Sequence, residues 1–194
     1  MKKLGFLALV MVMALGVGCA QKKPLTPEEI AAERERQIAA TTRIYEGKTP
    51  EEVLLAAATV LRWADDDYDI SHTSDSVHAT RNWMYIGFIV IPHGTDRWTI
   101  NAESVANGTK VKAACFVDDN MAARGGKEAT NNGLFSLFYG RLDYILGNSK
   151  NWLTCKDARK IYTDYLDPLC TVATDRTPDG KSAVERQKEQ ENRL

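Results

Sequence analysis

Hydrophobic positions first show a helical period just after residue 50. Apolar side chains recur there at spacings of three and four, which places them on one face of a helix. This stripe consists of Val53, Leu54, Ala57, Val60, Leu61 and Ala64. Thr49 and Glu52 have the spacing of a capping box, and Pro50 takes the first helical position. The pattern predicts an amphipathic helix that begins at residue 50 and packs one face against a core.

An earlier segment has the same start signal but a different composition. Thr26, Pro27 and Glu29 repeat the capping pattern, and residues 28–44 are rich in Ala, Glu and Arg with few large apolar side chains. A helix that is polar nearly all round usually serves as a spacer. We therefore expect a polar stalk helix over residues 28–44, with a stop at Gly47.

The pattern changes to strands after Asp67. Residues 68–73 and 77–83 are typical of two strands, joined by a turn over Ser74, Asp75 and Ser76. Residues 84–91 are apolar throughout and are followed by Pro92. This stretch is too short for a typical helix, so we expect either a buried strand or a loop in the core.

The clearest hairpin signal lies between residues 98 and 117. Asn107 and Gly108 are the preferred pair for a two-residue turn, which would pair Ala106 with Thr109. On the apolar face this register sets Trp98 opposite Val117, Ile100 opposite Cys115 and Ala102 opposite Ala113; on the other face it sets Glu103 opposite Lys112 and Thr99 opposite Phe116. The pairing predicts a sheet with one buried and one solvated face.

Two helices are expected after the sheet. Residues 118–132 are polar and indicate an exposed loop, whereas Leu134, Phe138, Leu142 and Ile145 have helical spacing. A further helix should begin after Thr154 and run from Cys155 to about Leu166. The fold class is therefore α+β: a helix packed on an antiparallel sheet of about four strands, followed by two C-terminal helices, with a polar N-terminal stalk helix.

Composition and charge exclude several classes of protein. The chain has 194 residues, 44% of them hydrophobic, and a formal net charge of -1. Low-complexity and broadly disordered chains differ from this composition. A polytopic membrane protein would need more than one long apolar run, and a general nucleic-acid binder would show a clustered basic excess.

The N-terminus carries an export signal. Lys2 and Lys3 precede an apolar run from Leu4 to Gly18, which is shorter than the about 20 residues that span a bilayer as a helix. Residues 15–20 (LGVGCA) place small residues directly before Cys19. An ordinary secretory signal, cut after a small residue such as Ala20, would discard Cys19.

The segment around Cys19 resembles the lipobox of bacterial lipoproteins, and the chain resembles small outer-membrane and periplasmic lipoproteins of Gram-negative bacteria. The resemblance implies that Cys19 is acylated and becomes the mature N-terminus. Because residue 20 is Ala and not Asp, it also implies an outer-membrane anchor. The expected organisation is a signal peptide (1–18), a tether with the polar helix (19–48), an α+β periplasmic domain (49–173) and a polar, disordered tail (174–194).

The other three cysteines allow a disulfide. In an oxidising periplasm, Cys155 and Cys170 are the expected pair. They can meet only if the intervening helix is short or the chain folds back, because a straight helix of about 11 residues is about 16 Å long. Cys115 could instead bond to either of them; otherwise it is a small buried hydrophobic residue. No two cysteines have the spacing typical of a zinc site.

Candidate catalytic groups are few. His72 and His78 flank the turn at Asp75 and could face each other across the hairpin, but a pair of surface histidines is the simpler interpretation. The acidic run over residues 65–69 lacks the glycine and the distant glutamate of a calcium loop. The sequence contains no nucleophile elbow, phosphate loop or metal-binding His-Glu pair. We therefore expect no metal and no cofactor.

These observations favour a non-enzymatic lipoprotein, anchored in the outer membrane through Cys19. Its periplasmic domain would bind another envelope protein, as an accessory of a secretion, conjugation or assembly complex. The helix-then-sheet order over residues 49–117 is loosely similar to domains of lipoprotein subunits in outer-membrane assembly machinery. Two alternatives remain open: a periplasmic enzyme or small-ligand binder that uses the His72/His78 hairpin, and an outward-facing surface lipoprotein.

Overall fold

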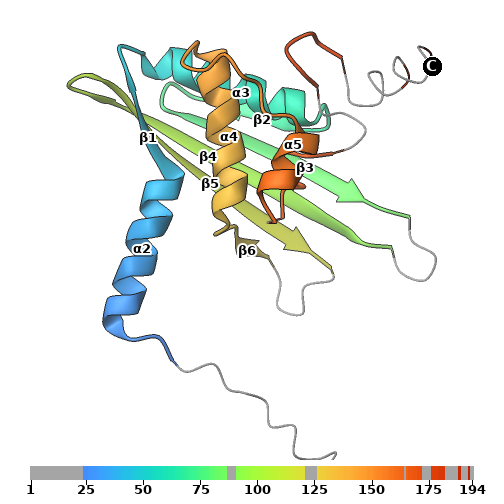
Figure 1. The fold of residues 1–194 in the computed structure, drawn as a ribbon, viewed down its shortest axis with the longest axis horizontal. Coiled ribbons are helices and arrows are strands. Elements are labelled where there is room, and N and C mark those ends of the chain that lie inside the picture. Colours follow the sequence, from blue (N-terminus) through green and yellow to red (C-terminus); the bar gives the residue numbers. More distant parts are fainter. Residues whose placement is uncertain are drawn as a thin grey trace, which may run out of the picture. The chain divides into compact units, whose positions relative to one another are not determined.

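The computed structural model describes residues 24–86, 91–120, 126–163, 165–171 and 176–181, together with Lys188 and Asn192. The chain divides into two compact units, residues 1–34 and residues 35–194. The signal segment with Cys19 lies outside the described residues. The helices and strands are, in chain order, α2 (Pro27–Thr41), β1 (Thr42–Glu46), α3 (Pro50–Ala64), β2 (Asp69–His72), β3 (Ser76–Met84), β4 (His93–Val105), β5 (Gly108–Asp119), β6 (Lys127–Glu128), α4 (Asn132–Ile145) and α5 (Cys155–Ile161) (Figure 1).

The fold is α+β, as predicted, but its sheet is larger than the four strands expected. The strand order is β1-β5-β4-β3-β2, and β6 pairs with β5 beyond the end of β1. Every pair of neighbouring strands is antiparallel. β1 and β6 therefore share one edge of β5, and the short strand β2 lies at the opposite edge of the sheet.

Strand β1 was missed because it lies where the polar helix was expected to continue. That helix was predicted over residues 28–44, but α2 ends at Thr41, whose hydroxyl donates to the carbonyl of Gln37 at 2.8 Å. The next residues pair with β5, from Thr42 opposite Lys112 to Glu46 opposite Gly108. β-branched and aromatic side chains favour a strand here, and Tyr45 is buried in the core.

The hairpin formed by β4 and β5 has the predicted faces but a register shifted by two residues. Its turn is formed by Ala106 and Asn107, so that Val105 pairs with Gly108. Trp98 therefore lies opposite Cys115, and Glu103 lies opposite Lys110. A shift of two residues keeps every side chain on its face, whereas a shift of one would have exchanged core and solvent.

Gly108 explains the shift. It has φ +150° and lies so close to β1 that an added Cβ atom would stand 2.1 Å from the carbonyl oxygen of Tyr45. A type I′ turn over Asn107 and Gly108 needs positive φ at both positions, and Asn107 is not among the positive-φ residues. Glycine is thus required at position 108 because β1 approaches there, and it does not form the turn.

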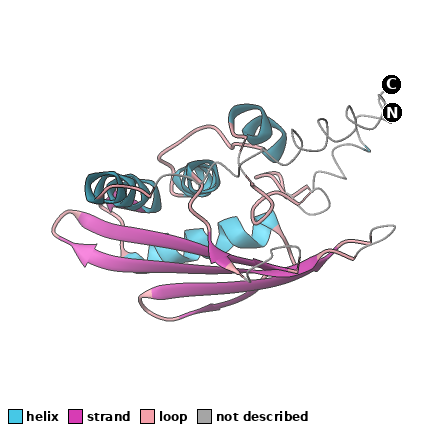
Figure 2. Cartoon of the chain, turned by 90° about the horizontal axis from the view of Figure 1, so that it is seen from below, coloured by secondary structure: helices cyan, strands magenta, loops and turns pink. Residues whose placement is uncertain are grey.

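Helix α3 begins and packs as the sequence predicts. The amide of Glu52 donates to the Thr49 hydroxyl at 3.2 Å, and the amide of Thr49 donates to the Glu52 carboxylate at 2.8 Å, which completes the capping box. All six predicted apolar side chains are buried. α3 contacts β3, β4 and β5 on one face of the sheet and contacts α4 alongside it (Figure 2).

The core lies between the sheet and these two helices. Trp98 of β4 is central to it: its ring stacks on Phe138 at 5.2 Å between centroids and meets the edge of Phe135 at 6.0 Å. Both phenylalanines come from α4, which is the first of the two predicted C-terminal helices. The opposite face of the sheet carries exposed polar side chains, among them Arg97, Asn101, Glu103, Lys110 and Lys112.

Candidate functional site

Strand β3 extends beyond the end of its neighbour β2. Pairing between the two strands stops at Asp69 opposite Thr80, whereas β4 pairs with the whole of β3 as far as Met84 opposite His93. Among the described residues, the last four of β3, 81–84, therefore have a strand along one edge only. A cavity of about 530 Å³ lies along the other edge.

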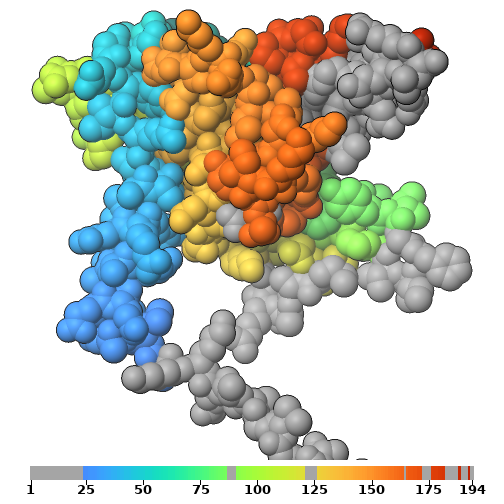
Figure 3. Space-filling view, viewed as in Figure 1, coloured from blue at the N-terminus to red at the C-terminus, as the bar shows by residue number. Residues whose placement is uncertain are grey.

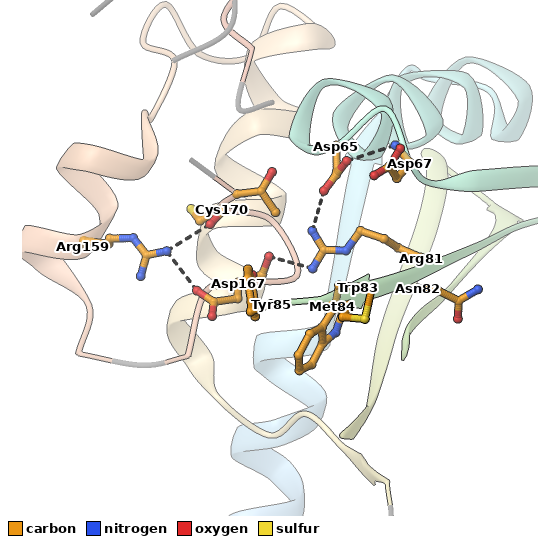
Figure 4. A pocket seen from close by; sticks show the side chains of 11 residues that line it. Asp65, Asp67, Arg81, Asn82, Trp83, Met84, Tyr85, Arg159, Asp167 and Cys170 are labelled. Atoms are coloured by element: carbon orange, nitrogen blue, oxygen red, sulfur yellow. Dashed lines mark hydrogen bonds and ion pairs between the residues drawn. The ribbon is translucent and has the colours of Figure 1, made fainter. Parts of the chain in front are cut away.

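Three parts of the chain surround this cavity (Figure 4). β3 and the residue after it contribute Arg81, Asn82, Trp83, Met84 and Tyr85; the end of α3 and the following turn contribute Asp65 and Asp67; the C-terminal part contributes Arg159, Asp167, Cys170 and Thr171. The site thus combines a strand edge, charged groups of both signs and the rings of Trp83 and Tyr85, which contact each other at a tilt with centroids 5.4 Å apart.

Arg81 occupies the base of the cavity and is almost fully buried. Its guanidinium donates to the carboxylate of Asp65 at 2.8 Å and to the carboxylate of Asp96. The indole N–H of Trp83 donates to the other carboxylate oxygen of Asp96 at 3.3 Å. Burial raises the pKa of Asp96, and the neighbouring Arg81 opposes that shift. Because an unpaired buried charge is costly, this network must stay intact for the end of β3 to keep its place.

The segment over residues 165–171, which we call the C-terminal strap, forms the opposite wall. Each of its carbonyls from Asp167 to Cys170 accepts a hydrogen bond from a different side chain. The pairs are Arg81 to Asp167 at 3.1 Å, Tyr68 to Pro168 at 2.7 Å, Arg141 to Leu169 at 3.1 Å and Arg159 to Cys170 at 3.0 Å. Leu166 and Leu169 are fully buried beneath it. The strap is therefore fixed by both main-chain and apolar contacts.

A disulfide between Cys155 and Cys170 ties the strap to α5, as predicted, with a Cα–Cα distance of 5.5 Å. The helix that was expected to reach Leu166 ends at Ile161, so the chain has room to fold back and bring the two sulfurs together. Cys115 is a free, buried cysteine on the core face of β5, and burial raises the pKa of its thiol.

The two histidines singled out in the sequence do not form a joint site. His72 lies opposite Val77, and His78 lies opposite Ser71. Because alternate positions of a strand pair point to opposite faces, the two imidazoles lie on different sides of the sheet. The His78 ring contacts the hydroxyls of Ser76 and Thr99. His72 lines a separate cavity of about 440 Å³ between α3 and the β2–β3 hairpin, with Leu54, Leu55 and Ala58.

Two of the four aspartates in the acidic run over residues 65–69 form ion pairs. Asp65 pairs with Arg81, and Asp66 pairs with Arg176 from the polar tail. Within the described residues, no group of three or more His, Cys, Asp or Glu side chains has an arrangement that could hold a metal ion.

Exposed apolar side chains extend from the open end of β3. Met84, Tyr85, Ile86 and Ile91 are 65%, 50%, 91% and 51% exposed, and we call these four residues the apolar ridge. The sequence predicted a buried strand or a core loop over residues 84–91. That prediction is wrong for these four residues, and residues 87–90 lie outside the described residues. The end of β3 and the start of β4, drawn in green, project at the margin of the molecule (Figure 3). An apolar run is buried only where a second layer covers it.

Sequence reasoning also missed the buried charges, although a signal for them is present. Arg81 has the same strand parity as the core residues Val77 and Ala79, and Asp96 has the same parity as Trp98 and Ile100. A charged residue at an inward position of an alternating strand predicts a buried partner of opposite charge. Arg81 and Asp96 are directly opposed in the register of β3 and β4.

None of the described helices has both the length and the apolar character needed to cross a membrane. The chain matches no protein-family model, no curated protein and no solved structure.

Proposed function

We propose that the chain is an outer-membrane-anchored lipoprotein whose periplasmic domain binds another envelope protein, as an accessory of a secretion, conjugation or assembly complex. The observation that carries this proposal is the apolar ridge beside the open edge of β3. Its four side chains are exposed to solvent, and residues 84–91, to which they belong, include no charged residue.

The ridge has the composition of a protein interface. Soluble monomers rarely expose large contiguous apolar patches, and aromatic residues and methionine are enriched in interface cores. Tyr85 and Met84 supply these residue types, and Ile86 and Ile91 supply aliphatic surface. The ridge begins directly after the Arg81 network, and its first two residues, Met84 and Tyr85, line the cavity opposite the strap, so its base is rigid. A rigid apolar surface loses little conformational entropy on binding.

Two separate features support the proposed location of the domain in the periplasm at the outer membrane. The lipobox-like residues before Cys19 provide the attachment point, and the disulfide between Cys155 and Cys170 is typical of an oxidising compartment. A lipid anchor confines the domain near other envelope proteins and raises its effective concentration. This arrangement suits an interaction module.

Crosslinking in intact cells, followed by mass spectrometric identification of the captured proteins, tests the interaction. We expect one reproducible envelope protein to be recovered with the wild-type chain and to be lost with Met84→Ser/Ile86→Ser. Ile44→Ser is the matched control, because Ile44 is an exposed isoleucine on β1 at the far edge of the sheet. Recovery of no envelope protein, or equal recovery with all three chains, would contradict the proposal.

Lipidation and location are tested separately. We expect metabolic labelling with palmitate to mark the wild-type chain, and Cys19→Ser to abolish the label and release the domain from the membrane fraction. Protease treatment of whole cells should leave a periplasmic domain intact. Cleavage in whole cells would indicate instead that the domain faces outward.

A further inference from the structure

We infer that the open edge of β3 binds an extended segment of the partner protein, which pairs with Asn82–Met84 as an added strand. This inference rests on the proposed function, since it names the place and the mode by which the partner is held. In this mode of binding, main-chain hydrogen bonds to β3 provide the affinity, and the side chains around the cavity determine which sequences bind.

The direction of the main-chain groups follows from the β2–β3 hairpin. The amide of Thr73 donates to the carbonyl of Ser76 at 2.8 Å, so Ser76 is bonded toward β2. Main-chain groups of an antiparallel strand alternate between its two edges, and the same alternation places those of His78 and Thr80 toward β2. Asn82 and Met84 continue this series past the point where β2 ends. Their N–H and C=O groups therefore point toward the cavity and away from β4.

The outer edge of β5 differs from that of β3, because short strands cover much of it. β1 and β6 pair with β5 there, and their registers run over Gly108–Lys112 and Phe116–Val117. An unpaired edge is normally shortened or covered, because it can pair with another chain. At residues 81–84 the edge of β3 has no strand beside it within the described ranges and adjoins a cavity of about 530 Å³, whose opposite wall is the C-terminal strap. The disulfide and the four carbonyl contacts fix that wall in advance of binding.

The lining indicates which side chains the added strand carries. Alternate residues of the strand would face the rings of Trp83 and Tyr85, and apolar or aromatic side chains fit these positions. Asp67 lines the same cavity and forms no ion pair in the part of the chain that the structure describes, unlike Asp65 and Asp167. The occupant is therefore an extended segment with apolar residues at alternate positions and a lysine or arginine among the residues between them.

A pair of synthetic peptides tests the pairing on the full mature chain. The first is an eight-residue peptide that alternates tyrosine or valine with lysine or threonine; the second is the same peptide with alternate main-chain amides methylated. We expect the first peptide to slow amide exchange at Asn82 and Met84, and the methylated peptide to bind about tenfold more weakly or worse, because it lacks the donors for the strand edge.

Two variants at one position separate main chain from side chain. Met84→Pro removes the N–H that faces the cavity and leaves the ladder to β4, and proline is tolerated at strand edges. Met84→Ala keeps that N–H. We expect Met84→Pro to weaken binding of the unmethylated peptide about tenfold or more, and Met84→Ala to change it by less than about threefold. If Met84→Pro fails to fold, the peptide pair on the wild-type chain still decides the result.

Several outcomes would overturn the inference. These are equal binding of the two peptides, no binding of either, or protection at β1 or β2 in place of Asn82 and Met84. Protection of Asn82 and Met84 without peptide, rising with protein concentration, would assign the edge to a second copy of the chain. The proposed function is tested separately. If an envelope protein is captured equally well with Met84→Pro, the edge pairing is contradicted and the proposed function stands. If the peptide pairs with the edge but no envelope protein is captured in cells, the proposed function is contradicted and the edge pairing stands.

Discussion

The two ends of the long antiparallel strands are built differently. At one end, β4 and β5 meet in a two-residue turn that is held to the start of the domain: the amide of Gly47 donates to the Asn107 carbonyl at 2.9 Å, and the Thr109 hydroxyl donates to the Lys48 carbonyl at 2.7 Å. At the other end, β3 and β4 lead into the apolar ridge, and no strand in the described part of the chain lies beside the outer edge of β3 at residues 81–84.

The two ends of the sheet therefore have different roles, one in stability and one in binding. At the closed end β1 pairs with β5, and the turn is hydrogen-bonded to Gly47 and Lys48, so residues at this end contribute to stability. The open end keeps main-chain groups and apolar surface available, and its position is secured from beneath by Arg81 and from the side by the strap. Changes beneath or beside the open end should therefore alter stability, whereas changes on the ridge should alter binding.

The largest effect is expected from Arg81→Met. Removing the guanidinium leaves two buried carboxylates, Asp65 and Asp96, without their cation, and loss of one partner of a buried ion pair typically costs about 3–5 kcal/mol. Urea unfolding followed by tryptophan fluorescence measures the change. Arg81→Met/Asp96→Asn should recover part of the loss, because it leaves one charge fewer. A loss below about 1 kcal/mol for the single variant would mean that the network does not hold β3.

The disulfide is expected to have the next largest effect. Cys155→Ser/Cys170→Ser should lower the free energy of unfolding by about 3 kcal/mol, the value expected for a loop closed over a sequence separation of 15. Amide exchange should rise most in the strap. A reducing agent should lower the stability of the wild-type chain similarly and leave the double variant unchanged. Equal stabilities of wild type and variant would show that the hydrogen bonds and buried leucines fix the strap alone.

At the closed end, Gly108→Ala should be destabilising by about 1–3 kcal/mol, because its φ disfavours a side chain and the new Cβ would meet the Tyr45 carbonyl. Gly140→Ala in α4 is the matched control. Its Cβ meets nothing within 4 Å, so alanine should raise stability by about 0.5–1 kcal/mol. Thermal unfolding measures both variants. A Gly108→Ala variant as stable as the wild type would contradict the requirement for glycine where β1 approaches.

The smallest effect on stability is expected at the ridge. Met84→Ser/Ile86→Ser should change the free energy of unfolding by no more than about 0.5 kcal/mol, because both side chains are exposed. Binding of a hydrophobic fluorescent dye to the folded protein should fall, since it reports exposed apolar surface. A large loss of stability would show that these side chains are packed, which would contradict their assignment to a binding surface.

Local signals predicted much of the fold. The capping box and apolar stripe of α3 are carried by residues close in sequence, and they were confirmed, as were the β2–β3 hairpin and the faces of β4 and β5. β1 could not be predicted in this way, because a five-residue strand next to a helix is specified by its partner β5, over 60 residues away. The register error followed from it, since the role of Gly108 depends on Tyr45.

The candidate site was harder to predict than the fold. The disulfide was found because Cys155 and Cys170 are few and chemically distinctive. The Arg81 network joins residues from three elements, and only the inward parity of Arg81 and Asp96 indicated it. The exposure of Ile86 depends on whether a second layer covers it, and Ile86 lies two residues beyond the end of β3 and is 91% exposed. An apolar sequence does not by itself show whether another helix or sheet packs over it.

One measurement tests the central claim, that the open end binds a partner and the closed end does not, most directly. A photo-crosslinking amino acid placed at position 86 in one chain and at position 44 in another compares two exposed isoleucine sites in intact cells, one at each end. We predict that irradiation yields a crosslinked envelope protein from position 86 and none, or far less, from position 44. Equal yields from the two positions, or a product from position 44 alone, would contradict the account.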